Sequence, residues 1–217
     1  MNVSGETSTF LSLAEIANAL SPYINAPLTD PQLARIAAYL GLLKKWNQTI
    51  PLTSIEADSE IVARHFGESI FASRFLACDT GRLADVGSGA GFPGIPLKIC
   101  LPALRVTLIE PNLKKCAFLR ELTVVLALES VEILRNPYEN VASPPESFDF
   151  VCSRALGNYR RLLQWARRVL TPGGHVILWL GLDDATSLSR QEGWNWQLPA
   201  NIPESKRRVL LIGQAAS

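Results

Sequence analysis

The sequence of 217 residues lacks several features that would assign a protein to a class at once. Its 4 cysteines include no CxxC pair and it has only 2 histidines, so no zinc-finger spacing exists and we expect no metal. No apolar run approaches the ~20 residues that a membrane helix needs, so no membrane partner is expected. The 21 basic and 20 acidic residues give a net charge of +1, which excludes a protein that is basic throughout.

The N-terminus also lacks the basic and apolar regions of a signal peptide. We therefore expect a cytoplasmic protein, in which the cysteines are small buried apolar residues rather than disulfide partners. Hydrophobic residues make up 47% of the chain and charged residues 19%, which is typical of a folded protein and excludes disorder as its main state.

The chain divides near residue 80 into two parts of different periodicity. In residues 1–80, apolar side chains recur at helical spacing in three stretches, near 10–20, 33–43 and 58–73. Asp30 is expected to cap the second helix with Pro31 at its first position, and the third is expected to start after Asp58 or Ser59. This part is predicted to be an N-terminal helical extension.

Residues 81–217 instead alternate between strand-like and helix-like segments. The strand-like runs lie at 82–86, 105–110, 130–134, 148–152 and 174–180, with helical stretches at 93–101, 112–127 and 158–170 between them. Strands separated by helices indicate a parallel sheet covered on both faces. Two late runs, near 194–199 and 207–213, can add an antiparallel edge. This part is predicted to be an α/β core with a Rossmann-like sheet.

The most informative segment runs from Leu83 to Gly94. There an apolar strand ends in an acid, and a glycine-rich loop then opens a helix. Glycine allows positive φ and lets the main chain approach a ligand closely. In open α/β sheets ligands bind at the carboxyl ends of the strands, which is where this loop would lie. The string from Gly89 to Gly94 also matches GxGxxG, a weak signal by itself that a plain glycine turn could satisfy.

Two carboxylates indicate which cofactor the loop suits. Asp85, directly before the loop, is unfavourable for a pyrophosphate at the helix N-terminus, but it suits the cationic centre and amino group of S-adenosylmethionine. Glu110, at the end of the next strand, can accept hydrogens from both ribose hydroxyls. The segment therefore predicts a class I S-adenosylmethionine-dependent methyltransferase sheet, with a cofactor site that includes Asp85, Gly87, Ser88, Gly89 and Glu110.

The chain lacks the residues that many methyltransferases use to activate an acceptor. After the fourth strand it has Cys152-Ser153-Arg154 instead of an Asn or Asp followed by two prolines and an aromatic residue. Guanine N7, which carries a lone pair and no proton, needs no general base and fits this absence. The protein would then supply proximity and orientation, worth roughly 7–11 kcal/mol. Arg154 is the candidate catalytic residue, because it could orient the base or the methionine carboxylate.

The run from Asp85 to Leu97 resembles the cofactor loop of a bacterial family of small-subunit ribosomal RNA guanine-N7 methyltransferases, RsmG, also called glucose-inhibited division protein B. Its ending, Gly-Phe-Pro-Gly-Ile-Pro-Leu, is more specific than a general methyltransferase loop. Further landmarks stand in the family's order at 42–47, 52–54, 64–66, 114–115, 118–120 and 153–155. The resemblance covers roughly residues 33 to 181.

The resemblance implies methyl transfer from S-adenosylmethionine to a guanine of 16S ribosomal RNA, as naked RNA or in the small ribosomal subunit. It places cofactor contacts at Gly87, Phe92, Tyr138, Glu139 and Arg154. The basic side chains that we expect to contact RNA are Lys44, Lys45, Arg64, Lys114 and Lys115. By contrast, His65 lies on an apolar helix face and is expected to be a hydrogen-bonded core residue rather than a catalyst.

Three positions depart from the family pattern: Pro51 where Asn is usual, Glu68 where Asp is usual, and Leu180 where Lys is common. The Asn and Lys positions are expected to contact the substrate, so the changes at Pro51 and Leu180 are expected to leave cofactor binding intact and to alter RNA positioning. Alternative functions are a small-molecule or protein methyltransferase with the same loop, a catalytically silent homologue that binds ribosomal RNA, and a nicotinamide-dependent dehydrogenase. Asp85 and the absence of an evident hydride-transfer acid disfavour the dehydrogenase.

Overall fold

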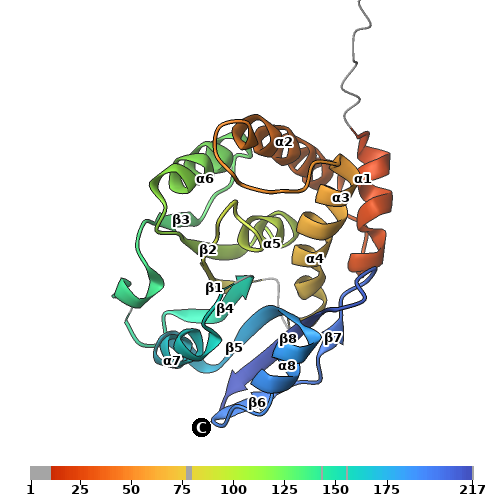
Figure 1. Cartoon of the computed structure of the whole chain (residues 1–217). Helices are drawn as coiled ribbons and strands as arrows, with labels where there is room; N and C mark the ends of the chain where they lie inside the picture. Colours follow the sequence, from red (N-terminus) through yellow and green to blue (C-terminus); the bar gives the residue numbers. More distant parts are fainter. Residues whose placement is uncertain (1–10, 77–79, 143, 155, 217) are drawn as a thin grey trace, which may run out of the picture.

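The computed structural model describes residues 11–76, 80–142, 144–154 and 156–216 (Figure 1). The N-terminal elements are α1 (Leu13–Leu20), η1 (Ser21–Tyr23), α2 (Asp30–Asn47), α3 (Asp58–Ile61), η2 (Val62–Gly67), α4 (Glu68–Ile70) and η3 (Phe71–Phe75). Phe10 in the first predicted helix, Cys78 and the landmark residue Ala155 lie outside the described residues.

The alternating elements then follow closely the order predicted from the sequence. They are β1 (Gly81–Val86), α5 (Gly94–Cys100), β2 (Leu104–Ile109), α6 (Leu113–Val125), β3 (Val131–Leu134), η4 (Tyr138–Asn140), β4 (Phe148–Arg154), α7 (Tyr159–Val169), β5 (Leu170–Gly181), α8 (Leu182–Leu188), β6 (Trp194–Trp196), β7 (Ala200–Asn201) and β8 (Arg208–Ala215). The short elements α8 and β7 were not predicted.

The strands form one sheet in the order β3-β2-β1-β4-β5-β8-β6, with β7 paired to β8. Strands β1 to β5 are parallel, which confirms the predicted parallel sheet, and β8 is antiparallel to β5. The late runs do form antiparallel strands. However, β8 is not an edge strand, because β5 pairs with one side of it and β6 and β7 pair with the other.

Alternate residues of the strands point to opposite faces of the sheet and into two different cores. Leu83 of β1 and Leu108 of β2 join the core under α5, α6 and the N-terminal helices, whereas Ala84 and Ile109 join the core under α7 and α8. Figure 1 shows the N-terminal helices on the same side as α5 and α6. The extension therefore shares its hydrophobic core with one face of the sheet.

The start of α2 differs from the prediction by one residue. Thr29, not Asp30, is the N-cap, and it forms a capping box with Gln32. The Thr29 amide donates to Gln32 Oε1 at 2.9 Å, so the cap satisfies a main-chain group that would otherwise be unpaired. The Thr-x-x-Gln spacing could have revealed this cap in the sequence.

The third helical segment, from Asp58 to Phe75, changes its winding along its length. Ala57 is its N-cap, and residues Val62–Gly67 form a π-helical turn. Gly67 lies against Tyr23, since a Cβ at Gly67 would come within 2.6 Å of the tyrosine ring.

No helix of the described residues is long and apolar enough to span a membrane. The described part of the chain also holds no group of three or more His, Cys, Asp or Glu arranged to bind a metal ion.

Candidate functional site

The glycine-rich loop crosses the carboxyl ends of β1 and β2, as the sequence predicts. Gly87, Gly89 and Gly91 have φ angles of +73°, +58° and +89°, values that side-chain-bearing residues rarely adopt. The Gly87 and Ser88 amides donate to Ile109 O at 2.9 and 3.2 Å, which fixes the loop to β2. A Cβ at Gly89 would meet only the Gly87 carbonyl, at 3.8 Å, so the main chain at Gly89 is accessible to a ligand.

Asp85 lies beneath the loop and is fully buried. Its Oδ2 accepts from the Gly94 amide at 2.9 Å, and its Oδ1 has no hydrogen-bond partner among the described residues. Burial raises the pKa of this carboxyl to about 7, although the Gly94 amide acts in the opposite direction. The side chain therefore holds the loop to the start of α5, which is the helix-capping role that the sequence left open as an alternative to cofactor binding.

Glu110 follows β2 and joins the loop to the next helix. Its Oε2 accepts from the Gly89 amide at 2.9 Å, and its Oε1 accepts from the Asn112 amide at 2.8 Å. Each carboxylate oxygen can accept two hydrogen bonds, so one acceptor position remains on each. The carboxylate is thus fixed in place and can still bind the two hydroxyls of a ribose.

Phe92 is buried, and its ring lies in an aromatic cluster between the loop and the N-terminal helices. It stacks on Tyr39 with centroids 5.1 Å apart and on His65 at 4.9 Å, and meets Phe66 edge to face at 5.2 Å. The Tyr39 hydroxyl also donates to the Ala90 carbonyl. The Phe92 side chain therefore anchors the loop to the N-terminal helices.

Arg154 ends β4 and reaches across to the N-terminal helices. Its Nη1 donates to Arg64 O at 3.0 Å, and its Nη2 lies 2.7 Å from His65 Nδ1. The guanidinium carbon lies 6.0 Å from the centre of the Phe92 ring. Burial lowers the pKa of Arg154 from its ordinary value, while nearby Glu68 acts to raise it. The His65 ring is hydrogen-bonded inside the protein, as expected from its position on an apolar helix face.

Tyr138 and Glu139 form a short turn after β3. The Tyr138 ring is buried and packs edge to face on Trp165 of α7, with centroids 5.7 Å apart, whereas Glu139 is exposed. Burial raises the pKa of Tyr138, and the Glu139 charge adds to the effect. The sequence pattern predicts a short turn near 137–142, and the structure has it; the proposed contact of these two residues with the cofactor came only from the family resemblance.

Three of the five basic residues expected to contact RNA form ion pairs in this structure: Lys44 with Asp58 at 2.6 Å, Lys45 with Glu121 at 3.8 Å, and Arg64 with Glu60 at 2.5 Å. Lys114 and Lys115 form no ion pair with any residue that the structure describes. They stand in the first turn of α6, where Asn112 Oδ1 accepts from both of their amides. The N-terminal end of the helix dipole is positive, so two lysines without an acidic partner are electrostatically unfavourable at these positions.

The three departures from the family pattern lie in different surroundings. Pro51 is exposed in the loop after α2. The buried Glu68 carboxylate pairs with Arg208 at 2.5 Å, which joins α4 to the start of β8. Leu180 is only 2% exposed and packs in the core under α8, so it is not placed to contact RNA.

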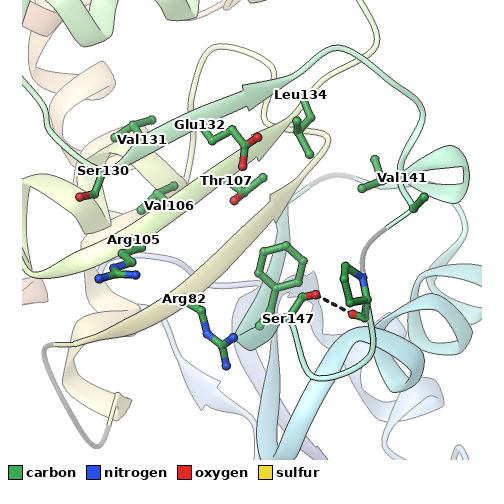
Figure 2. A pocket seen from close by; sticks show the side chains of 13 residues that line it. Arg82, Arg105, Val106, Thr107, Ser130, Val131, Glu132, Leu134, Val141 and Ser147 are labelled. Atoms are coloured by element: carbon green, nitrogen blue, oxygen red, sulfur yellow. Dashed lines mark hydrogen bonds between the residues drawn. The ribbon is translucent and has the colours of Figure 1, made fainter.

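A groove of about 730 Å³ lies away from the loop. Figure 2 shows it over β1, β2 and β3, with Arg82 and Arg105 toward one side and Val141 on the opposite side. These arginines stand near the amino ends of their strands, while the glycine-rich loop crosses the carboxyl ends. Between β3 and β4 the described residues form one helical element, the short turn η4, so no described helix covers this part of the sheet face. The groove is therefore separate from the candidate cofactor site.

Comparison with known proteins agrees with this geometry. Residues 32–199 match the family GidB, described as rRNA small subunit methyltransferase G. The chain belongs to this family. It is 33% identical over 196 residues to ribosomal RNA small subunit methyltransferase G of Chromobacterium violaceum, covering 89% of this chain and 92% of the relative. It is 38% identical over 196 residues to the protein of that name from Roseiflexus sp. (strain RS-1), covering 85% and 84%.

Solved structures support the same fold at lower identity. A SAM-dependent methyltransferase from Aquifex aeolicus aligns with a TM-score of 0.62 and 17% identity, covering 82% of this chain and 98% of that one. A ribosomal protein L11 methylase from Lactobacillus delbrueckii subsp. bulgaricus aligns at 0.59 and 15%, covering 71% and 80%. The sheet order is that of a class I methyltransferase, and the N-terminal helical extension is present, as predicted.

As a member of the methyltransferase G family, the chain is an S-adenosylmethionine-dependent methyltransferase. Its residues fit that cofactor. The main chain at Gly89 is open, and the Glu110 oxygens keep free acceptor positions. The Nη groups of Arg154 make all of its hydrogen bonds to described residues, so its Nε–H has no acceptor among them. This Nε–H is also partly accessible, so it can donate to a ligand.

Proposed function

We propose that this chain transfers the methyl group of S-adenosylmethionine to N7 of a guanine in 16S ribosomal RNA, with the small ribosomal subunit or its RNA as partner. The family match over residues 32–199 carries the proposal, because it includes most of α2, the helical segment from Asp58 to Phe75 and the cofactor loop. A ribosomal substrate also places the reaction in the cytoplasm.

The proposed cofactor contacts lie along the carboxyl edge of the sheet. The main chain of Gly87, Ser88 and Gly89 would face the methionine part, and Glu110 would accept from the ribose hydroxyls. The turn at Tyr138 and Glu139 would border the adenine. Asp85 and the Phe92 ring support these contacts from below, because their side chains hold the loop in its shape.

Bound S-adenosylmethionine supplies a methyl group made electrophilic by the positive sulfur. Guanine N7 has a lone pair and no proton at neutral pH, so its methylation requires no base to remove one. The protein then contributes orientation and proximity, worth roughly 7–11 kcal/mol in well-aligned reactions. In this proposal the Arg154 Nε–H would orient the base or the methionine carboxylate.

The proposed RNA face begins at the start of α6. Lys114 and Lys115 follow the carboxyl end of β2, beside the cofactor loop, and no described acid pairs with them. Lys44, Lys45 and Arg64 would have to exchange an acid for a phosphate in order to bind RNA. We therefore propose that Lys114 and Lys115 contribute more to RNA affinity than the other three.

The deciding experiment uses deuteromethyl S-adenosylmethionine and small ribosomal subunits that lack the modification. Nucleoside mass spectrometry should detect labelled 7-methylguanosine with the wild-type protein and none with Arg154→Ala. Cofactor binding by calorimetry and the thermal midpoint of each protein serve as controls. No label despite measured cofactor binding would overturn the proposed acceptor and favour the silent homologue.

A further inference from the structure

The π-helical turn Val62–Gly67 holds the guanidinium of Arg154. Arg154 Nη1 donates to the Arg64 carbonyl at 3.0 Å and approaches the His65 carbonyl at 3.4 Å. It also lies 3.5 Å from Ser69 Oγ, which itself donates to the His65 carbonyl. A π-turn displaces carbonyls from the regular helical pattern, and such turns are frequent at functional sites. A helix of the N-terminal extension thus sets the position of a residue at the end of β4.

The same contact fixes the state of the His65 ring. Arginine can only donate hydrogen bonds, so His65 Nδ1 must accept from Arg154 Nη2, 2.7 Å away. A neutral ring then carries its hydrogen on Nε2, which lies 2.7 Å from Thr53 Oγ1 and donates to it. Each ring nitrogen therefore has one defined partner.

Thr53 is itself fixed by the end of α2. Asn47 Oδ1 accepts from the Leu52 and Thr53 amides at 2.8 and 2.9 Å, and Asn47 Nδ2 donates to the Thr53 carbonyl at 2.9 Å. The Thr53 hydroxyl oxygen also accepts from the Ile55 amide at 3.1 Å. The hydroxyl that receives the His65 hydrogen bond is thus held from several directions.

The His65 ring also contacts the cofactor loop directly. It stacks on Phe92 with centroids 4.9 Å apart and planes 26° apart. The Arg154 guanidinium also lies over the Phe92 ring, with its central carbon 6.0 Å from the ring centroid. A shift of the His65 ring would therefore disturb both Arg154 and the loop.

We propose that His65 is a positioning residue for methyl transfer: its Nδ1 orients Arg154, and Thr53 fixes the ring through Nε2. The proposal rests on the proposed function, because the orientation matters for the reaction in which Arg154 takes part. The Nε–H edge of Arg154 remains free for the ligand, while its Nη groups are used for this support.

Three substitutions at position 65 separate positioning from packing. In His65→Asn the Oδ1 atom stands in place of Nδ1, so it can accept from Arg154. In His65→Gln the terminal amide stands in place of Nε2 and keeps only the contact with Thr53. His65→Phe keeps the stacking on Phe92 and removes both hydrogen bonds. We expect kcat to fall about 3- to 10-fold in His65→Asn and about 10- to 100-fold in the other two.

Packing alone predicts a different order, with His65→Phe closest to wild type and the two amides equally impaired. That order, or three equal rates, would overturn the proposal. Thr53→Val provides a second variant that keeps shape and removes the acceptor of the Nε2 hydrogen. It should lower kcat about 3- to 10-fold with little change in KM for the RNA substrate, and an unchanged kcat would also count against the proposal.

Nuclear magnetic resonance gives a readout that does not require activity. The chain has 2 histidines, so His175→Gln leaves His65 as the single ring to observe. ¹⁵N shifts at pH 7 should show a protonated Nε2 and an unprotonated Nδ1, and the Nδ1 shift should change in Arg154→Leu. A charged ring or the opposite tautomer would overturn the proposed contact. If the wild type bound no cofactor while these shifts held, the proposed function would fail and the Arg154 contact would stand.

Discussion

The two faces of the sheet are covered to different extents, and the candidate site belongs to the more heavily covered one. One face lies under α5, α6 and the N-terminal helices, with an aromatic cluster of Tyr39, Phe66 and Phe92. The other lies under α7 and α8 and leaves β1 to β3 open at the groove that contains Arg105. On the first face the same residues support both folding and the cofactor loop, whereas Arg105 is exposed and lines the groove.

Truncation of the aromatic cluster tests the comparison most strongly. Phe92→Ala should lower the free energy of unfolding by about 3–5 kcal/mol, because it removes a buried ring that touches three others. Urea denaturation measures this change, and calorimetry should show weaker S-adenosylmethionine binding. Leu198→Ala is the control, since that side chain is 92% exposed. Similar losses in the two variants would contradict the difference between core and surface.

Asp85 allows a pH test of the covered face. Burial raises the pKa of Asp85 from 3.8 to about 7, so the folded protein keeps a proton that the unfolded chain releases. Its contribution to stability is therefore full below about pH 4 and is lost as the pH rises to about 7, a change of at most about 4 kcal/mol. Asp85→Asn should remove this part of the pH dependence of the unfolding free energy. Equal profiles for both proteins from pH 4 to 8 would rule out the buried carboxyl as its source.

RNA binding provides a third test, in which a cation beside the loop is compared with one on the open face. Replacing both Lys114 and Lys115 with Ala should reduce the slope of log K against log salt by about 1 to 2, because each phosphate contact contributes about 0.7 to 0.9. Arg105→Ala removes an exposed cation near the amino end of β2 and should leave the slope unchanged. Filter binding with 16S ribosomal RNA across a salt series measures both slopes. Equal slopes for the two variants would place the RNA elsewhere.

The smallest expected effect is a change in the free energy of unfolding caused by an exposed arginine on the open face. Arg82 and Arg105 stand opposite each other on β1 and β2. Arg82 forms an ion pair with Asp149, whereas Arg105 forms none with a described residue. Like charges at such positions are destabilising, so Arg105→Thr should raise the free energy of unfolding by about 0.2–1 kcal/mol. Urea denaturation at low salt measures it. A loss of stability instead would show that Arg105 contributes packing to the sheet.

The sequence predicted those parts of the fold that follow from local patterns. Alternating strands and helices between residues 81 and 181 were correct, because apolar periodicity and loop glycines report local conformation. The π-turn at residues 62–67 could not be predicted, since its contacts are with Arg154 from β4 and with the Tyr23 ring, both distant in the sequence. Glu110 and the glycine loop lie together as predicted. The contact between Arg154 and His65 was not predicted, because the two residues are 89 positions apart and no local sequence pattern reports such a contact.

The last strand has a consequence for the order in which the chain folds. β8 lies inside the sheet, and its first residue, Arg208, reaches the buried carboxylate of Glu68. The Trp179 indole donates to the Glu68 carbonyl, 111 residues away along the chain. Contacts between such distant segments slow folding, because a long loop must close before they form. During synthesis the helix that holds Arg154 can therefore dock fully only after the C-terminal strand has emerged from the ribosome.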